Sequence, residues 1–391
     1  MKSNSLTKPE KSLPFKWYYD QKIFQKEITK IFNDEWLYVC HISSIDKNHY
    51  RTLSVNNKNI VLIKNKLNDI SVFYNTCSHR GSQIFDQKEG KVKSPIIICP
   101  YHQWSYDLSS GKLLNTTSLK LKNFDKKKYG LQKVNFYIWK GLVFVNLNSK
   151  KKFNLQSTFQ YYDKTIEKID LENFVVGHVW KKNVLCNWKI YWENYSECLH
   201  CPNIHPELSD LVPLYQRRLV DIKDHPEWVI LKKTNSHSKY HGGLKNGAET
   251  WSVDGSSQGQ SIEDVQSELE SRGQIYISTW PTMFLGIYGD HIRIVRLIPI
   301  SSEEVELTAE WLFPKSTLSN SIYKMENVID FGILVMNQDA NISEVNQRGI
   351  YNLEKNSVDL YASVRSLYLQ RRDYLTNDGN SSDEDQWKDF K

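Results

Sequence analysis

The chain has 391 residues, of which 40% are hydrophobic and 25% are charged, and its formal net charge is +6. This length and composition suit a soluble globular protein with two domains. No apolar run approaches the ~20 residues of a membrane span, and residues 1–15 lack the apolar core of a signal peptide. The basic residues are dispersed rather than gathered in a patch. We therefore expect a cytoplasmic protein that binds neither membranes nor nucleic acid.

The first segment, residues 1–36, begins with polar residues and then carries apolar side chains at helical intervals from Phe15 to Trp36. We expect a helix there that packs on the second domain. After Trp36 the pattern changes to short β-prone runs separated by turn signals. These runs cover residues 37–42, 59–64, 70–75, 96–101 and 137–147. They predict a small antiparallel β-domain over residues 37–150.

The β-domain contains two short motifs, CSHRG at residues 77–81 and CPYHQW at residues 99–104. Each motif places one cysteine and one histidine on a loop between strands: Cys77 with His79, and Cys99 with His102. Two thiolates and two neutral imidazoles can bind one zinc ion. They can also hold a [2Fe–2S] cluster, with the cysteines on one iron and the histidines on the other. Zinc fingers usually place two cysteines together and two histidines together. Here each loop supplies one cysteine and one histidine, which favours the [2Fe–2S] cluster.

Residues 151–375 form a second, mixed α/β region, followed by an acidic tail at 376–391 that we expect to be disordered. Alternating or apolar runs predict strands at 175–188, 273–281, 283–300 and 304–314. Helical patterns predict helices at 155–168, at about 317–349 and at 355–373. The turn-rich stretch 206–275 predicts long loops beside a substrate entrance.

Residues 187–208 carry apolar side chains at helical spacing and include a candidate metal site. Glu197 and His200 are three positions apart, so we expect them on one helical face. We expect Pro202 to end the helix, so that His205 approaches from another direction. Two imidazoles and one distant carboxylate form the facial triad of a non-haem Fe(II) centre. Taken alone, such a pair of histidines is more often structural or part of a zinc site, and the upstream cysteine–histidine motifs are what favour iron.

Taken in order, these motifs resemble the α subunit of Rieske non-haem iron oxygenases, within the aromatic-ring-hydroxylating dioxygenase superfamily. The resemblance implies an α+β fold, in which an antiparallel β Rieske [2Fe-2S] domain precedes a helix-grip-like catalytic domain with a central antiparallel sheet. It also implies that Cys77, His79, Cys99 and His102 hold the cluster.

The same resemblance implies that His200, His205 and Asp339 hold a mononuclear Fe(II). Asp339 is the choice for the third ligand because residues 337–339, Asn-Gln-Asp, followed by Gln-Arg-Gly at 347–349, are similar to the family pattern at that position. An exposed helical carboxylate is the alternative reading of Asp339.

A Rieske oxygenase implies partners. Electrons would come from NAD(P)H through a separate flavin or iron–sulfur reductase, and O2 would be the co-substrate. Family members typically form homotrimers in which the cluster of one subunit faces the iron of its neighbour. Glu197 stands where ring-hydroxylating dioxygenases carry an aspartate, and it would link a cluster histidine, His102, to His200 and so carry electrons between them.

The strings ECLHC at 197–201 and HPEL at 205–208 resemble the branch that acts on quaternary ammonium compounds, such as glycine betaine, carnitine and stachydrine oxygenases. That branch usually carries a tyrosine where Leu199 stands. The implied reaction is N-demethylation or C–N cleavage. Three alternatives remain: an aromatic-acid ring hydroxylase or O-demethylase, a Rieske electron-transfer protein with a binding domain, and a zinc protein without a redox role.

The six cysteines, at positions 40, 77, 99, 186, 198 and 201, are expected to bind metal or to stay reduced rather than to form disulfides. For Cys198 and Cys201 in particular we expect a packing role beside His200, since a facial triad needs no thiolate.

Overall fold

The computed structural model describes residues 12–55, 57–117, 123–148, 166–217, 233, 243–262 and 273–353. The chain divides into two compact units, one of Phe32–Asn154 and the other of Met1–Ile31 together with Leu155–Lys391. The first unit is therefore inserted between two parts of the second. The expected helix at 355–373 and the tail at 376–391 lie outside the described residues, as does the expected helix at 155–168 except for its last turn.

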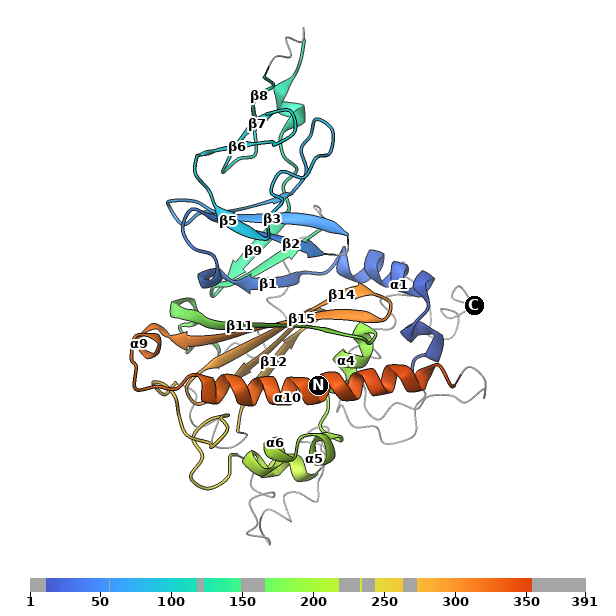
Figure 1. Cartoon of the computed structure of the whole chain (residues 1–391), viewed down its shortest axis with the longest axis vertical. Helices are drawn as coiled ribbons and strands as arrows, with labels where there is room; N and C mark the ends of the chain where they lie inside the picture. The colour runs from blue at the N-terminus through green and yellow to red at the C-terminus, as the bar shows by residue number, and fades with distance from the viewer. Residues whose placement is uncertain are drawn as a thin grey trace. The chain divides into compact units, whose positions relative to one another are not determined.

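The inserted unit is built from short antiparallel strands (Figure 1). Its described strands are β1 (Leu37–His41), β2 (His49–Val55), β3 (Lys58–Lys64), β4 (Ile70–Tyr74), β5 (Glu89–Lys91), β6 (Ile96–Ile98), β7 (Ser105–Asp107), β8 (Leu113–Asn115), β9 (Asn135–Trp139) and β10 (Leu142–Asn146). They form three sheets with the orders β1-β10-β9, β4-β3-β2-β5 and β6-β7-β8. Short 3-10 helices occur at η3 (Ile42–Ser44) and η4 (Lys126–Tyr129). The antiparallel β architecture is as expected.

The run at 137–147, expected as one strand, is a hairpin. Lys140 and Gly141 both have left-handed backbones, with φ of 47° and 81°, and they reverse the chain between β9 and β10. A side chain at Gly141 would collide with the ring of His41, so this turn requires glycine there. A continuous apolar pattern cannot reveal such a reversal unless the turn residues are recognised.

The second unit contains a five-stranded antiparallel sheet of order β11-β15-β14-β13-β12. The strands are β11 (Phe174–Val184), β12 (Ile275–Thr279), β13 (Met283–Ile287), β14 (Ile292–Ser301) and β15 (Glu304–Pro314). The run at 283–300 contains two strands, because residues 288–291 form the turn between β13 and β14. The central strands β14 and β15 are buried along almost their whole length. A mixed α+β fold with a central antiparallel sheet is thus confirmed.

The described helices of this unit lie before, between and after its strands. They are η1 (Phe15–Tyr18), α1 (Gln21–Glu27), η2 (Ile28–Phe32), η5 (Leu171–Asn173), α4 (Trp188–Tyr195), α5 (Cys201–Ile204), α6 (Pro206–Leu211), η6 (Pro213–Arg217), α9 (Lys315–Leu318) and α10 (Glu326–Ile350). In the described ranges, none has both the length and the apolar character needed to cross a bilayer.

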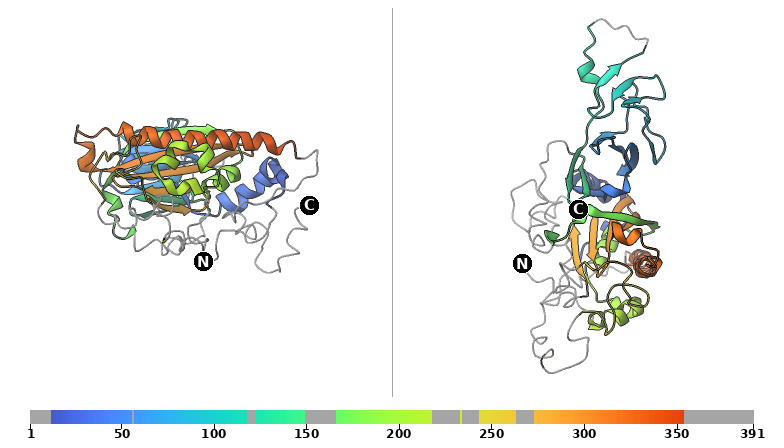
Figure 2. Two further views of the ribbon diagram at one scale, coloured as in Figure 1. Left: turned by 90° about the horizontal axis from the view of Figure 1, so that it is seen from below. Right: turned by 90° about the vertical axis from the view of Figure 1, so that its left-hand side faces the viewer.

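The longest helix, α10, lies along one face of the five-stranded sheet (Figures 1 and 2). It begins at Glu326 and not near residue 317, as its sequence pattern indicated. The side chain of Asn320 accepts the N–H of Ile322 at 3.1 Å, and this local turn competes with the helix. Ile322, expected on the apolar face, is 79% exposed.

The N-terminal segment is three short helices rather than one. Asp20 caps α1 by accepting the N–H groups of Lys22 and Ile23 at 2.7 and 3.1 Å. At the other end of α1, the buried Glu27 accepts from the Lys189 ammonium at 2.7 Å and from the indole of Trp188 at 2.8 Å. These contacts bind α1 to α4, the helix that leads into the candidate site.

Candidate active site

Two loops of the inserted unit, one after β4 and one between β6 and β7, are folded alike around a cysteine. The N–H of Cys77 or Cys99 donates to the carbonyl five residues later, at 2.8 and 2.9 Å. The carbonyl of each cysteine accepts the N–H four residues later, at 2.9 and 3.0 Å. That fourth residue, Gly81 or Gln103, has a left-handed backbone in both loops, with φ of 73° and 59°. The two motifs therefore have the same backbone turn.

The four predicted cluster residues lie on these loops. Cys77 and Cys99 are buried in one hydrophobic cluster, whereas His79 and His102 are half-buried with ring centroids 4.7 Å apart. Nδ1 of His79 is buried without a hydrogen-bond partner, as expected for a nitrogen reserved for a metal. His79 also stacks on Trp104 at 4.6 Å, which fixes its ring.

The spacing of these donors distinguishes a cluster from a single ion. Within the part of the chain that the structure describes, only His200, Cys201 and His205 form a group whose ligand atoms all lie within 4.8 Å of one another. One tetrahedral zinc ion needs all its donors within roughly 4 Å of each other. The two thiols and two imidazoles of the loops after β4 and between β6 and β7 form no such compact group in the described residues, so they fit a [2Fe–2S] cluster better than a single zinc ion.

The hydroxyl of Tyr106 lies 3.0 Å from Sγ of Cys77. It also accepts the N–H of Ser78 at 3.3 Å. Burial raises the pKa of Tyr106, and the neighbouring Cys77 raises it further, so the phenol keeps its proton and can donate it to the sulfur. A donor to a ligand sulfur favours the more negative, reduced state of a cluster.

We expect Tyr106→Phe to lower the reduction potential of the cluster. The drop should be on the order of 40 mV, which corresponds to about 1 kcal/mol for one electron. A redox titration followed by visible absorption measures the shift. Tyr129→Phe is the control, because the ring of Tyr129 packs against the same Trp104 and none of the described hydrogen bonds joins its hydroxyl to Cys77 or Cys99. We expect it to leave the potential unchanged. Equal potentials for the wild type and Tyr106→Phe would contradict the assigned hydrogen bond.

The local backbone of the second site differs from the helix expected at 187–208. Helix α4 ends at Tyr195, and residues 196–200 form an irregular link to α5. Glu197 and His200 meet in this link rather than on a helical face. The Glu197 carboxylate accepts the N–H of Leu199 and lies 2.8 Å from Nδ1 of His200. Pro202 lies in the first turn of α5, where its missing N–H costs nothing, so it does not end the helix.

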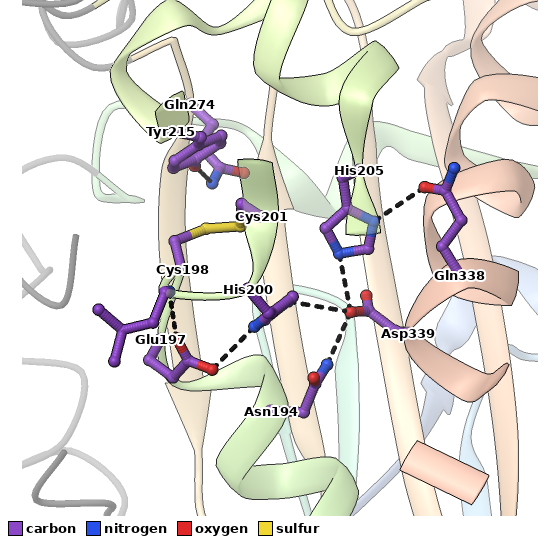
Figure 3. Close-up of a disulfide and its surroundings, with 11 residues drawn as sticks. Asn194, Glu197, Cys198, His200, Cys201, His205, Tyr215, Gln274, Gln338 and Asp339 are labelled. Atoms are coloured by element: carbon purple, nitrogen blue, oxygen red, sulfur yellow. Dashed lines mark hydrogen bonds and ion pairs between the residues drawn. A yellow bond between two sulfur atoms is a disulfide. The ribbon is translucent and has the colours of Figure 1, made fainter. Parts of the chain in front are cut away.

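His200, His205 and Asp339 converge from three parts of the chain (Figure 3). His200 precedes α5, His205 lies between α5 and α6, and Asp339 lies in the middle of α10. One oxygen of Asp339, Oδ1, lies 3.4 Å from Nε2 of His200 and 3.0 Å from Nε2 of His205. Two ring nitrogens and one carboxylate facing a common point are the donor set of a facial triad.

The other nitrogen of each ring is also engaged. Nδ1 of His200 pairs with Glu197 at 2.8 Å, and Nδ1 of His205 donates to Oε1 of Gln338 at 2.8 Å. Gln338 in turn donates to Glu207 at 2.9 Å. These partners engage Nδ1 of both rings, so Nε2 is the nitrogen left on each ring to bind a metal at the common point. Sequence reasoning missed Gln338 and Glu207, although Gln338 adjoins Asp339 in the Asn-Gln-Asp pattern.

The charges of the site suit a cation. Burial lowers the pKa of His200, but the carboxylates of Asp339 and Glu197 outweigh burial and raise that pKa to about 9. Burial raises the pKa of Asp339, yet hydrogen bonds from His200 and His205 bring it down to about 2. Asn194 also donates to Oδ1 of Asp339 at 2.6 Å. The buried carboxylate thus attracts positive charge, which a divalent metal can supply in place of a proton.

Cys198 and Cys201 form a disulfide, so the expectation of reduced thiols was wrong for this pair (Figure 3). The turn between α4 and α5 brings their Cα atoms to 5.0 Å, within bonding range for a disulfide. Cys201 lies among the candidate ligand atoms, but its sulfur is bonded to Cys198. Two imidazoles and a carboxylate remain, in keeping with iron. Cys40, Cys77, Cys99 and Cys186 are buried and are not disulfide-bonded.

A cavity of about 300 Å³ opens onto the three converging side chains. Its walls include four aromatic residues, Tyr195, Tyr215, Trp251 and Tyr276, and one cationic residue, Arg293. Gln274 donates to the hydroxyl of Tyr215 at the cavity wall (Figure 3). The site therefore combines a candidate metal centre with a cavity that has aromatic residues in its wall and is large enough for a small organic molecule.

Comparisons with known proteins identify the family of both parts of the chain. A profile described as "Ring hydroxylating alpha subunit (catalytic domain)" matches residues 171–376, and one described as "Rieske [2Fe-2S] domain" matches residues 35–125. The chain is 29% identical to a glycine betaine monooxygenase oxygenase subunit of Pseudomonas aeruginosa, over 87% of this chain and 82% of that protein. It is 30% identical to a carnitine monooxygenase oxygenase subunit of Escherichia coli, over 51% of this chain and 54% of that protein.

The fold also matches a solved structure of a quaternary ammonium Rieske monooxygenase, CntA. The TM-score is 0.66 and the identity 21%, over 87% of this chain and 85% of that one. At this identity the likeness shows the fold alone. The match of residues 171–376 to a catalytic domain decides against the alternatives of an electron-transfer protein and of a zinc protein without a redox role.

Proposed function

This chain belongs to the family of ring-hydroxylating α subunits and is a Rieske non-haem iron oxygenase, and from that premise we propose that it oxidises a quaternary ammonium compound. The family uses a [2Fe-2S] cluster, a mononuclear iron, O2 and electrons from a donor protein. We assign the cluster to Cys77, His79, Cys99 and His102. We assign the iron to His200, His205 and Asp339.

The observation that carries the substrate class is the aromatic wall of the cavity beside the triad. The rings of Tyr195 and Tyr276 lie 5.5 Å apart, and Trp251 lines the same cavity. A trimethylammonium group cannot donate a hydrogen bond, but it is attracted to aromatic faces by about 0.5–2 kcal/mol for each good contact. The relatives named for glycine betaine and carnitine support the same class.

When bound, the iron would supply O2 activation and the cluster would supply electrons. The chain's own side chains position the substrate: the aromatic wall holds the ammonium group with a neighbouring C–H bond directed toward the triad. Hydroxylation of an N-methyl group would consume O2, two electrons and two protons and release water. The resulting N-hydroxymethyl group would lose formaldehyde, for a net N-demethylation. Hydroxylation next to nitrogen on a longer chain would instead break that C–N bond and release trimethylamine.

We assign to Glu197 the link by which electrons reach this site, in a homotrimer that places His102 of one subunit near Glu197 of the next. Glu197 is mostly buried, its side chain 12% exposed, and it holds His200 through Nδ1. A carboxylate so placed can connect the ring of a metal ligand to a second imidazole. A separate NAD(P)H-dependent reductase is the assigned electron donor, and the cytoplasm the assigned compartment.

Product analysis tests the proposal. Anaerobically purified, iron-loaded protein is supplied with a surrogate reductase and NADH, and then with glycine betaine, carnitine, choline, stachydrine or benzoate. Formaldehyde, trimethylamine and hydroxylated products are measured by mass spectrometry, because O2 uptake alone would also report uncoupled turnover. We expect stoichiometric formaldehyde or trimethylamine from one quaternary amine. Product from benzoate only would keep the oxygenase and overturn the substrate class.

A further inference from the structure

Arg293, on β14, is a buried cation that lines the cavity. The residue is only 5% exposed to solvent. Its guanidinium donates to the hydroxyl of Tyr195 at a long 3.4 Å and lies 5.6 Å from the centre of the Tyr288 ring. Among the ion pairs that the structure describes, none involves Arg293.

A second arginine on the same strand, Arg296, shows how a buried cation of this fold is paired when its role is structural. Arg296 is also 5% exposed, but it donates to the Glu306 carboxylate at 3.0 Å and to the Thr308 hydroxyl at 3.1 Å. A buried charge without a partner costs several kcal/mol. Arg296 has its anion within the chain. Arg293 instead faces a cavity from which an anion could come.

The long helix leaves room for this guanidinium. A Cβ atom at Gly332 of α10 would lie 2.8 Å from Nη1 of Arg293 and 2.8 Å from the indole of Trp311. Glycine inside a helix costs about 1 kcal/mol relative to alanine, so a glycine in the middle of α10 has a local cost. The close packing explains the glycine, because a side chain at Gly332 would collide with both the guanidinium of Arg293 and the indole of Trp311.

We propose that Arg293 binds the carboxylate of the substrate, so that the substrate class is a betaine, a quaternary ammonium compound that also carries a carboxylate. The guanidinium fork matches the two oxygens of a carboxylate. The aromatic wall holds the other, cationic end of the molecule. Choline, which has a neutral hydroxyl in place of the carboxylate, lacks the group that Arg293 would bind. This inference rests on the proposed function and narrows it.

Calorimetric titration of the full-length protein with three matched ligands tests the inference. Glycine betaine, its methyl ester and choline share the trimethylammonium group, and only the first carries a carboxylate. We expect the wild type to bind glycine betaine on the order of 10–100-fold more tightly than the other two, as a buried charge-assisted pair provides. We expect Arg293→Gln to lower the affinity for glycine betaine by the same factor. Its affinities for the methyl ester and for choline should change by less than about twofold.

Two further variants separate charge, fork geometry and general damage. Arg293→Lys keeps the charge without the fork, and we expect an intermediate loss of affinity for glycine betaine. Arg296→Gln removes the other buried arginine of β14, and we expect it to leave the ratio between the three ligands unchanged. Equal wild-type affinity for glycine betaine and its ester would overturn the inference. Because that comparison needs no variant, it holds even if Arg293→Gln does not fold.

The two proposals fail in different ways. Turnover of glycine betaine with no dependence on Arg293 would overturn the carboxylate role and keep the quaternary ammonium function. Arg293-dependent binding of benzoate, with no binding of any quaternary amine, would overturn that function and the betaine class while keeping Arg293 as a carboxylate-binding residue.

Discussion

Asp339→Ala is expected to remove the mononuclear iron and to lower turnover on the order of 1,000-fold, while the cluster remains. Loss of several kcal/mol of metal-dependent stabilisation of a transition state corresponds to about three powers of ten in rate. The carboxylate of Asp339 faces Nε2 of both His200 and His205, so its removal leaves two imidazoles without the anion that completes the site. Iron per chain is measured by mass spectrometry, and the cluster by its visible absorption.

Asp330→Ala is the matched control for this experiment. Asp330 lies on the same helix, α10, but is exposed to solvent. We expect Asp330→Ala to keep both the mononuclear iron and the activity. If Asp339→Ala retained iron beyond the two atoms of the cluster and remained active, the third ligand would have to be another residue.

Glu197→Gln is expected to lower turnover by about 10–100-fold, the range typical for partners of metal ligands. Glutamine keeps an oxygen that can accept from Nδ1 of His200, so the substitution removes charge and changes shape little. We expect the reductase to reduce the cluster at the wild-type rate. Reoxidation of the cluster in the presence of substrate and O2 should become slow, and stopped-flow absorption measures both steps separately.

The comparison for Glu197→Gln is Asp210→Asn, which neutralises an exposed carboxylate on nearby α6 that pairs with Lys245. We expect this variant to reoxidise its cluster at the wild-type rate. Unchanged coupling between cluster oxidation and turnover in Glu197→Gln would show that the carboxylate does not carry electrons. Loss of iron from Glu197→Gln would instead assign it the positioning of His200.

Much of the fold and site could be predicted because local patterns and chemistry agreed there. Residues 304–314 alternate in the manner of a strand, and they became β15, which is nevertheless buried along almost its whole length. The cysteine–histidine loops were predictable because few arrangements use two thiols and two imidazoles in this order. The prediction of Asp339 as a ligand required a family resemblance, since nothing in the local sequence distinguishes it from the other carboxylates of α10.

What could not be predicted depended on tertiary contacts. Helical spacing continued through Glu197 to His200, but their pairing uses an irregular link whose carboxylate satisfies local N–H groups. Arg293 and Arg296 look alike in a strand-forming sequence, and only their neighbours separate a paired cation from one that faces a cavity. The start of α10 also depends on a local turn, in which the side chain of Asn320 accepts the N–H of Ile322. The sequence gives only a weak signal for such a turn, so the first residue of the helix could not be predicted.

The ion pair between Glu27 and Lys189 has a consequence for the order in which the parts of the protein can fold during synthesis. The two residues are 162 positions apart, with the whole inserted unit between them. At ~5–20 residues per second, a ribosome needs about 8–30 s to travel from one to the other. During that time the inserted unit can complete its fold, while Glu27 of α1 still lacks the Trp188 and Lys189 side chains that later donate to it. Helix α1 is thus synthesised before the inserted unit but reaches its final environment only after that unit has emerged.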